Sequence, residues 1–304
     1  MRLNARNDTI RCHTPVIWPS YLPHMSRETP LIRFGVLADP QYAPLPANIV
    51  GNRYYEASFG KLSAALAVLE AEDLEFVITL GDLIDRGWEN FDTVLPLFDA
   101  SRHECLFLPG NHDFLVAPEH LTAVHAKLRM PAPYHHFLRA GIRFIVIDCC
   151  EESLFATGSD PQRHGQAAAR LAELEAAGAV NAKNWNAGIS RSQFEWLRDM
   201  LDRAAWDGEK VVVMGHYPLY PDSDHNLWDS AEVATLIASY SNVIAYLNGH
   251  QHTGNLAQLG RTWFINFKGM VDTPDENAFG IVEIFSDRIE ITGHGREVSR
   301  TLAL

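Results

Sequence analysis

The chain of 304 residues has few cysteines, few basic residues and no long apolar run. Its four cysteines, Cys12, Cys105, Cys149 and Cys150, have neither the spacing of a zinc ribbon nor that of a disulfide framework, which favours a reducing compartment. The first thirty residues contain no apolar segment of the kind that a secretory signal needs, and no run is long enough to cross a membrane. We therefore expect a cytoplasmic protein without a membrane partner.

Acidic residues outnumber basic ones: the chain has 25 Lys and Arg and 38 Asp and Glu, so its formal net charge is −13 at pH 7. Such a chain repels the phosphate backbone of nucleic acids, so we expect no nucleic-acid partner. A phosphate-bearing ligand would have to be attracted locally and not by the protein as a whole. Nothing in the pattern indicates an oligomeric state.

Apolar residues make up 47% of the chain, which at this length can bury a large core. No internal repeat and no low-complexity break divides it. We expect a single domain over residues 31–304, with an insertion at the rim of the site at about 151–188. Residues 1–30 have little periodicity, and we expect an N-terminal extension there that is disordered or reflects an upstream start.

Five short apolar runs each end in a polar residue of a type that binds metal ions. They are LIRFGVLA before Asp39 and Gln41, EFVITLG before Asp82, CLFLPG before Asn111, VVVMG before His216, and VIAYLNG before His250 and His252. Runs of this kind predict strands buried on both faces, and ligands gather beyond the carboxyl ends of such strands. We expect the seven side chains to converge on one edge.

Taken singly, each of these residues is more often a turn residue, a helix cap or a satisfied histidine. The joint pattern is different, because a glycine directly precedes Asp82, Asn111, His216 and His250. Glycine there allows a positive φ or a close approach of the backbone to an ion. Carboxylate, amide and imidazole donors without thiolate suit Mn²⁺, Fe, Zn²⁺ or Mg²⁺. Seven donors exceed one tetrahedral ion, so we expect two ions bridged by Asp82.

Five sequence blocks resemble the signature of the calcineurin-like metallophosphoesterases. They are DPQ at 39–41, GDLID at 81–85, GNHD at 110–113, GH at 215–216 and GHQH at 249–252. The first block is commonly D-x-H in that superfamily, and Gln41 in place of the histidine resembles the manganese-dependent ADP-ribose/CDP-alcohol diphosphatases. Stretches that begin at Asn52, Trp185, Asn248 and Asn266 are similar to the same branch. The resemblance extends from about residue 31 to about residue 296.

This resemblance implies a four-layer α/β/β/α sandwich of two mixed β-sheets flanked by helices. It also implies two divalent ions, Mn²⁺ first and Fe, Mg²⁺ or Zn²⁺ as alternatives. One ion would be held by Asp39, Gln41, Asp82 and His252, and the other by Asp82, Asn111, His216 and His250. A neutral amide at Gln41 is a weaker donor than imidazole and should favour the harder, oxygen-preferring ions.

The resemblance further implies the reaction and the residues that assist it. His112 would face the scissile phosphate without binding an ion, and Asp85 would orient His112. The substrate would be a small nucleotide such as ADP-ribose or a CDP-alcohol, whose diphosphate linkage is cleaved by attack of a metal-bound hydroxide.

Substrate contacts are less well defined. Arg53 and Phe279 lie in the stretches most similar to the diphosphatases and would serve the second phosphate and the base, although core packing is an equal interpretation of an aromatic side chain. Arg86 completes a D-R-G triplet that resembles the protein Ser/Thr phosphatases and could bind a phosphomonoester. Further candidates are Tyr54, Tyr55, Trp185, Asn186 and Tyr220.

Two alternatives follow from this ambiguity. A cyclic-nucleotide phosphodiesterase or a phosphomonoesterase would use the same two ions and His112. A scaffold that has lost catalysis is more remote, because such a protein would be expected to lack donors and here none is missing.

Apolar spacing predicts helices at about 54–70, 90–101, 118–128, 190–205 and 227–239. A hairpin is expected around Ala140 and Gly141, and further strands are expected after Arg261.

Overall fold

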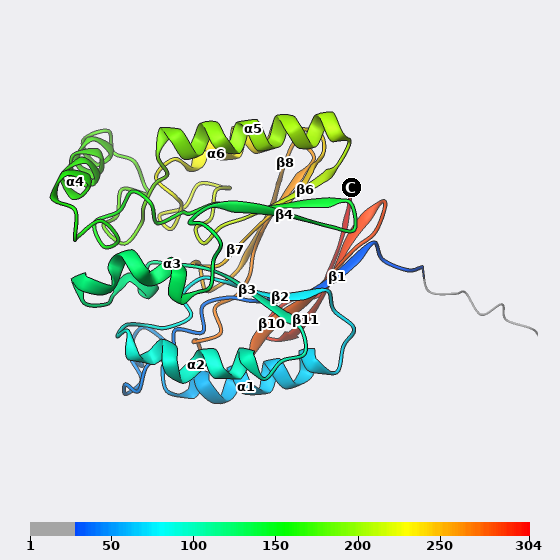
Figure 1. Ribbon diagram of the computed structural model, residues 1–304, viewed down its shortest axis with the longest axis horizontal. Coiled ribbons are helices and arrows are strands. Elements are labelled where there is room, and N and C mark those ends of the chain that lie inside the picture. The colour runs from blue at the N-terminus through cyan, green and yellow to red at the C-terminus, as the bar shows by residue number, and fades with distance from the viewer. Residues whose placement is uncertain (1–27) are drawn as a thin grey trace, which may run out of the picture.

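The computed structural model describes residues 28–304. The extension expected over residues 1–30 lies outside this range except at its end, and Cys12 lies outside it as well. The described chain forms two mixed β-sheets that face each other, with helices on both outer sides (Figure 1). The expected four-layer sandwich is therefore confirmed.

The first sheet contains six strands in the order β12-β11-β10-β1-β2-β3. Their bounds are β1 Ile32–Leu37, β2 Phe76–Leu80, β3 Glu104–Leu108, β10 Ala278–Ile284, β11 Arg288–Gly295 and β12 Arg300–Ala303. Strands β1, β2 and β3 run parallel, while β10 pairs antiparallel with β1 and continues into β11 and β12. The strands expected in the tail after Arg261 are thus present, and three of them complete this sheet.

The second sheet also contains six strands, in the order β4-β5-β6-β7-β9-β8. Their bounds are β4 His135–Arg139, β5 Ile142–Val146, β6 Lys210–Met214, β7 Val243–Asn248, β8 Asn255–Leu259 and β9 Thr262–Asn266. Strands β5, β6, β7 and β9 are parallel, and the two edge strands are antiparallel to their neighbours. The expected hairpin is formed by β4 and β5, with Ala140 and Gly141 at φ 50° and 74° in its turn.

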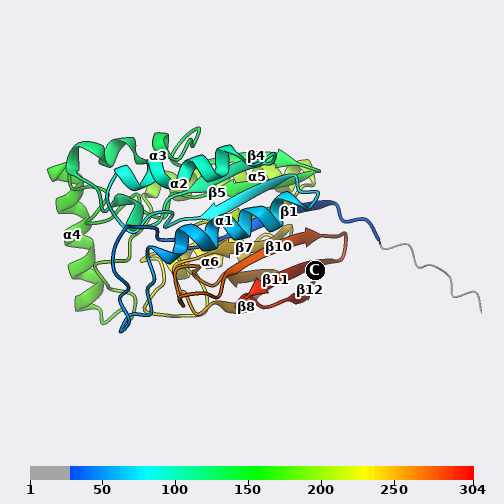
Figure 2. The ribbon, with the colours of Figure 1, turned by 90° about the horizontal axis from the view of Figure 1, so that it is seen from below.

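Helices lie on the outer faces of the two sheets and at one end of the molecule (Figure 1). They are α1 Ala57–Glu70, α2 Glu89–Asp99, α3 Val124–Lys127, α4 Pro161–Ala176, α5 Arg191–Asp207 and α6 Ser230–Ala238. Figure 2 shows α1 and α2 side by side on the first sheet, and Figure 1 shows α5 and α6 on the second. All five predicted helices are present. The one expected at 118–128 divides into a 3₁₀ turn, Pro118–Ala123, and the single turn of α3.

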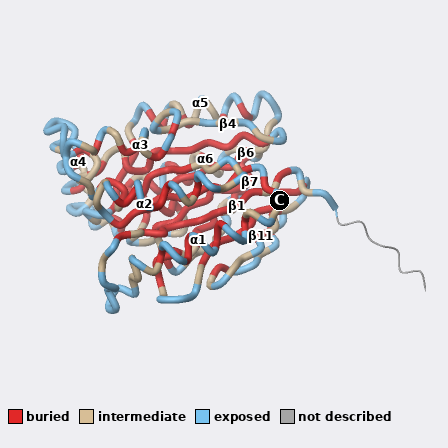
Figure 3. The backbone as a smooth tube through the Cα atoms, turned by 60° about the horizontal axis from the view of Figure 1, so that its bottom comes forward, coloured by how far each residue is buried: buried red, intermediate tan, exposed pale blue. Residues whose placement is uncertain are grey.

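The core lies between the two sheets. Phe34 and Phe76, from neighbouring strands of the first sheet, stack with ring centroids 4.8 Å apart, and both meet the edge of Phe144 from the second sheet at 5.6 and 5.3 Å. All three rings are fully buried. Figure 3 shows the strands buried along most of their length and the outward helix faces exposed. Burial of this continuous apolar layer fixes the two sheets against each other.

The five apolar runs all form strands, but these strands belong to different sheets. β1, β2 and β3 lie in the first sheet and β6 and β7 in the second. The expectation of one edge therefore needs a correction, because the seven side chains gather where the carboxyl ends of two sheets meet. The sandwich allows this because its two sheets present the ends of their parallel strands at the same end of the molecule (Figure 1).

Residues 151–188 contain α4 and the loops on both sides of it. In Figure 1, α4 lies at the end of the molecule toward which β1 runs. That this segment is an insertion stays a prediction. No helix within residues 28–304 is both long enough and apolar enough to cross a membrane.

Candidate metal centre

Seven polar side chains are enclosed where the strand ends meet. Each is at most 8% exposed, and they are the expected set: Asp39, Gln41, Asp82, Asn111, His216, His250 and His252. Burial of so many carboxylates and imidazoles is unfavourable unless they are paired or bind metal ions.

One part of this group surrounds Gln41. Its Nε2 donates to Asp82 Oδ2 at 2.9 Å and lies 3.3 Å from His252 Nε2. His252 Nε2 is also 3.7 Å from Asp39 Oδ1. The four residues expected around one ion are therefore neighbours in the structure.

The other part surrounds His216. Its Nε2 lies 3.4 Å from Asp82 Oδ2 and 3.3 Å from Asn111 Oδ1. Asp82, His216 and His250 each place a potential ligand atom within 4.8 Å of the others. Asp82 thus belongs to both parts, as a bridging carboxylate would.

The donors suit a cation. Within residues 28–304 the buried Oε1 of Gln41 has no hydrogen-bond partner, and an unpaired amide oxygen in such a place is costly without an ion or water. Carboxylate, amide and imidazole atoms face one another here without a lysine or arginine among them. The residues present therefore fit divalent ions of the Mn²⁺ or Mg²⁺ type.

Four of the seven residues have an uncommon backbone conformation. Asp39, Gln41, Asp82 and His250 have φ of 48°, 46°, 54° and 67°. Residues other than glycine rarely adopt positive φ, and such positions concentrate at functional sites because the surrounding fold must impose them. The abrupt turn after each strand aims the side chain inward.

The glycines before these residues act mainly through their size. Only Gly81, at φ 92°, adopts the positive φ that was one of the two expected reasons for glycine at these four positions. At Gly110 a Cβ would collide with Asp82 and His216, and at Gly249 it would lie 2.6 Å from Asp39 Oδ2. At the other three positions glycine makes room for the facing side chains, and the expected close approach to an ion stays a prediction.

Each histidine of the centre has one ring nitrogen occupied by an acceptor. His216 Nδ1 lies 2.8 Å from the carbonyl oxygen of Leu80, and His252 Nδ1 lies 2.8 Å from Asp272 Oδ1. Both acceptors lack a proton, so both imidazoles donate through Nδ1. This leaves Nε2 with its lone pair facing the centre, which is the arrangement that metal-binding histidines adopt.

His250 is held through its other nitrogen, because Nε2 lies 3.2 Å from Asn186 Oδ1. The amide nitrogen of Asn186 donates to the carbonyl oxygens of Asn181 and Asp224 at 3.0 and 2.7 Å, which turns Oδ1 toward the imidazole. Asn186 was a candidate for substrate contact, whereas the structure places it behind His250. No local motif identifies Asn186 or Asp272 as the partner of a histidine.

His112 and Asp85 form a pair beside the centre. His112 Nδ1 lies 2.9 Å from Asp85 Oδ1, and the backbone N–H of His112 donates to Asp82 Oδ1 at 2.8 Å. Burial opposes protonation of His112, but the charges of Asp82 and Asp85 outweigh it and raise its pKa. The side chain of Asp85 is fully buried while that of His112 is partly exposed. The imidazole therefore stands between the buried centre and solvent.

Charges within the centre are strongly coupled. Burial would lower the pKa of His216, but the adjacent carboxylate of Asp82 raises it to about 9. Burial likewise opposes the ionised form of Asp82, and the charges of His216 and His112 overcome it and lower the pKa of this carboxyl. The pocket thus favours a cation between Asp82 and His216, whether a proton or a metal ion.

The expected substrate contacts have different surroundings. Arg53 Nη1 lies 2.5 Å from Asp272 Oδ1, so its guanidinium is engaged next to the centre. Arg86 Nε lies 2.5 Å from Asp85 Oδ2, with 55% of its side chain exposed. Phe279 is 5% exposed and stacks on His294, with ring centroids 4.5 Å apart. Because β10 is buried along its whole length, the structure does not offer Phe279 as a stacking surface for a base.

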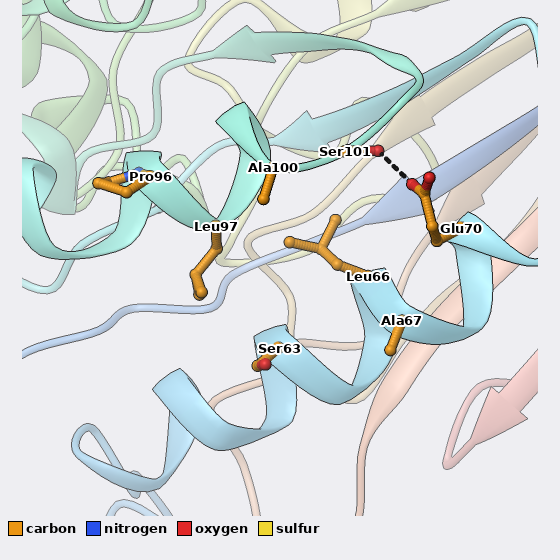
Figure 4. A pocket seen from close by; sticks show the side chains of 8 residues that line it. All are labelled: Ser63, Leu66, Ala67, Glu70, Pro96, Leu97, Ala100 and Ser101. Atoms are coloured by element: carbon orange, nitrogen blue, oxygen red, sulfur yellow. Dashed lines mark hydrogen bonds between the residues drawn. The ribbon is translucent and has the colours of Figure 1, made fainter.

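A surface pocket elsewhere contains none of these residues. It lies between α1 and α2 and is lined by Ser63, Leu66, Ala67, Glu70, Pro96, Leu97, Ala100 and Ser101 (Figure 4). Its one carboxylate, Glu70, accepts a hydrogen bond from Ser101 Oγ at 2.9 Å. This lining offers no group of donors that could hold an ion.

The two-sheet sandwich and the group of donors at its strand ends define a metallophosphoesterase. A family model described as calcineurin-like phosphoesterase matches residues 32–254. The chain belongs to this family and is a hydrolase that acts on phosphoric ester or anhydride bonds. Both the expected family and the expected class of enzyme are confirmed.

Named relatives extend over nearly the whole chain. The manganese-dependent ADP-ribose/CDP-alcohol diphosphatase of Homo sapiens is 28% identical over 317 residues, covering 90% of this chain and 92% of the relative. That of Arabidopsis thaliana is 28% identical over 307 residues, covering 88% and 95%. A crystal structure of a dimetal phosphatase from Danio rerio has a TM-score of 0.80 and 24% identity, covering 90% of this chain and 99% of that one, and shows the same fold.

Proposed function

We propose that the protein is a dinuclear metal-dependent hydrolase that cleaves the diphosphate linkage of nucleoside diphosphate derivatives such as ADP-ribose or CDP-alcohols. The observation that carries this proposal is Gln41, a buried amide at the position where the superfamily commonly has a histidine. The relatives named for this activity match the chain over nearly their full length, which supports the same substrate class.

The centre would hold two divalent ions, with Mn²⁺ first among the candidates. Asp39, Gln41, Asp82 and His252 would bind one ion, and Asp82, Asn111, His216 and His250 would bind the other. When bound, two such ions lower the pKa of water and neutralise negative charge on a phosphate group. The two neighbourhoods around Gln41 and His216 support this division of the residues between the ions.

His112 would donate the proton that the leaving phosphate oxygen needs. The charges of Asp82 and Asp85 raise the pKa of His112 and so favour the protonated imidazole, and Asp85 holds Nδ1 so that Nε2 is free to face the substrate. Because Asp85 is itself paired with Arg86, the orientation of His112 depends on both neighbours.

A nucleobase would pack on Trp185 in place of Phe279. Trp185 is 43% exposed and directly precedes Asn186, the partner of His250. Its carbonyl oxygen accepts a hydrogen bond from Tyr217 at 2.7 Å, which fixes the backbone beside the centre. An exposed indole in this place has the flat apolar surface on which a base can stack.

Arg86 supports a second candidate, a phosphomonoesterase or cyclic-nucleotide phosphodiesterase. Its side chain is mostly exposed, and it lies beside the Asp85–His112 pair. A guanidinium in this place could pair with a terminal phosphate, which a monoester presents and a diphosphate linkage or a cyclic diester does not, so of these two Arg86 favours the phosphomonoesterase.

The deciding experiment compares four substrates with metal-stripped protein that has been reloaded with Mn²⁺. These are ADP-ribose, CDP-choline, a 2′,3′-cyclic nucleotide and an aryl phosphate. Release of AMP and CMP from the first two at much higher kcat/KM supports the diphosphatase. Preference for the cyclic or aryl ester supports the second candidate, and failure of all four to react with any divalent ion refutes both.

A further inference from the structure

We propose that Asp272 is a positioning residue that fixes His252 for metal binding, and that Arg53 holds Asp272 in place and does not bind substrate. The inference rests on the metal centre of the proposed function but is independent of the substrate. It assigns a role to a carboxylate outside the five sequence blocks and reassigns an arginine that the sequence had suggested for phosphate binding.

Two donors share one oxygen of Asp272. His252 Nδ1 lies 2.8 Å and Arg53 Nη1 lies 2.5 Å from Asp272 Oδ1. Asp272 is only 6% exposed, so its charge is compensated mainly by these neighbours and not by water. A carboxylate that accepts from Nδ1 holds the imidazole in one tautomer and makes Nε2 a better electron donor.

The backbone around Asp272 is held on several sides. Lys61 Nζ donates to the carbonyl oxygens of Met270, Asp272 and Thr273, the last two at 3.0 and 2.8 Å. Arg296 Nη2 donates to the carbonyl oxygen of Asp272 at 3.3 Å. Two buried or partly buried cations thus bind the carbonyl groups of this loop and fix the position of the carboxylate.

The same loop is joined to the first metal-binding segment. The N–H groups of Met270 and Val271 donate to the carbonyl oxygens of Ala38 and Asp39 at 2.9 and 3.0 Å. A Cβ on Gly269 would lie 2.5 Å from the ring of His252, so glycine lets the loop approach the imidazole. Asp272 is therefore positioned relative to Asp39 as well as to His252.

His252 differs from the other two histidines in the charge of its partner. His216 faces the carbonyl oxygen of Leu80 and His250 faces an amide oxygen, both of which are neutral. Among the ring nitrogens that point away from the centre, within residues 28–304, only that of His252 faces a carboxylate. It is also the histidine grouped with Gln41, whose amide is a weaker donor than the imidazole that commonly stands at this position in the superfamily. We infer that Asp272 offsets the weak donation of Gln41 at this ion.

Arg53 connects this pair to an exposed loop. Its backbone N–H and carbonyl groups pair with those of Asn48 at 2.9 and 2.8 Å, and its Nη1 also donates to the carbonyl oxygen of Gly51 at 2.9 Å. The guanidinium is thus committed to its own loop and to Asp272. Removal of the Arg53 guanidinium should allow the Asp272 carboxylate to rotate. This should lower the metal affinity of the site indirectly, through His252.

The test is metal binding by the full chain after removal of metal. Mn²⁺ stoichiometry and affinity are measured by isothermal titration and by elemental analysis of Asp272→Asn, Asp272→Glu, Arg53→Met and wild type. We expect Asp272→Asn to lower the affinity for one of the two Mn²⁺ ions by about 10- to 100-fold and to leave the affinity for the other unchanged. Arg53→Met should lower the affinity for the same ion by a smaller factor. Asp272→Glu should bind this ion more tightly than Asp272→Asn does, although less tightly than wild type.

Glu209→Gln is the matched control, because it removes another carboxylate paired with an arginine. Glu209 Oε2 lies 2.6 Å from Arg143 Nε at the start of β5 and β6, the opposite end of these strands from the centre. This variant should bind both ions as wild type does. Thermal unfolding without metal identifies any variant whose fold has changed.

Nitrogen NMR of the imidazoles gives a readout that does not depend on bound metal. In wild type we expect His252 to be fixed as the Nδ1–H tautomer, and in Asp272→Asn to show a mixture. The inference would be overturned if Asp272→Asn and Arg53→Met bind both Mn²⁺ ions with wild-type affinity. It would also be overturned if the His252 tautomer is unaltered in Asp272→Asn. If wild type itself does not bind two ions, the proposed function fails first.

Arg53→Met also separates positioning from substrate contact. A positioning role predicts that KM for ADP-ribose returns to the wild-type value once Mn²⁺ is raised to saturation. A KM that stays high at saturating Mn²⁺ would restore Arg53 as a phosphate-binding residue and would contradict the proposal.

Discussion

Asn186 Oδ1 lies 3.2 Å from Nε2 of His250, although 64 residues separate them in the chain. The contact joins the end of the segment expected as a rim insertion to a buried histidine of the centre. Because the amide nitrogen of Asn186 is occupied by two carbonyl groups, only its oxygen can face the imidazole. His250 is thereby held with Nδ1 free for an ion.

We therefore expect Asn186→Ala to lower Mn²⁺ affinity by about tenfold at one of the two ions, because His250 loses the acceptor that fixes its tautomer. Asn186→Asp keeps an oxygen in the same place and should retain most of the affinity. Isothermal titration of metal-free protein measures both. Asn184→Ala, two residues away and exposed, is the control and should not change binding. Equal affinities in Asn186→Ala and wild type would exclude this role.

His112→Ala should keep both ions and lose most of the rate. The imidazole lies beside Asp82 and Asp85 but is not among the seven donors, so its removal should leave Mn²⁺ stoichiometry unchanged. Loss of a general acid lowers kcat by about 10²- to 10⁴-fold. Steady-state kinetics on ADP-ribose, together with elemental analysis of bound Mn²⁺, checks both parts. A variant that turns over normally would remove His112 from the mechanism.

The strand-end residues were predictable from sequence because each stands within four residues after the end of the strand that positions it. Asp82, for example, comes directly after Gly81 at the end of β2, so an apolar run and one polar residue contain the necessary information. This pattern does not predict how the two sheets pack face to face. That packing depends on contacts such as Phe34 with Phe144, which join strands far apart in the chain.

The supporting residues were harder to predict for the same reason. Asp272 stands 20 residues after His252 in a loop without periodicity, and only folding brings its carboxylate to Nδ1. Similarity of a stretch does not report which side of a strand is covered, and Phe279, the expected base contact, is buried. Arg53, the expected phosphate contact, lies next to the centre with its charge directed to Asp272.

Gln41→His should leave the fold intact and change the preference among metals. Imidazole is a stronger donor than an amide to Zn²⁺, so the variant should gain activity with Zn²⁺ and depend less on Mn²⁺. Activity of stripped protein reloaded with Mn²⁺, Mg²⁺ or Zn²⁺ measures the preference. Gln41→Glu, which adds a charge in place of the imidazole, serves as the comparison and should favour Mn²⁺ and Mg²⁺. An unchanged order of metals in both variants would contradict our interpretation of this position.

Lys61 should make stability depend on pH in the alkaline range. Burial and the nearby charge of Arg296 lower its pKa to about 8, below the ordinary value of 10.5 that it regains on unfolding. Between these values the unfolded chain binds a proton at Lys61 that the folded protein does not, so raising the pH stabilises the folded protein. The free energy of unfolding should rise by about 3 kcal/mol over this window relative to a variant without the amine.

Urea unfolding of wild type and Lys61→Met from pH 7 to 10.5, with a chelator present, isolates this contribution. Subtracting the variant cancels the other groups that titrate in the same range, and the chelator removes metal binding as a cause. Lys61→Met should be less stable at every pH, because three buried carbonyl groups lose their donor. The gap to wild type should widen as the pH rises above 8. Parallel curves would mean that the amine keeps its ordinary pKa and that its hydrogen bonds compensate fully for burial.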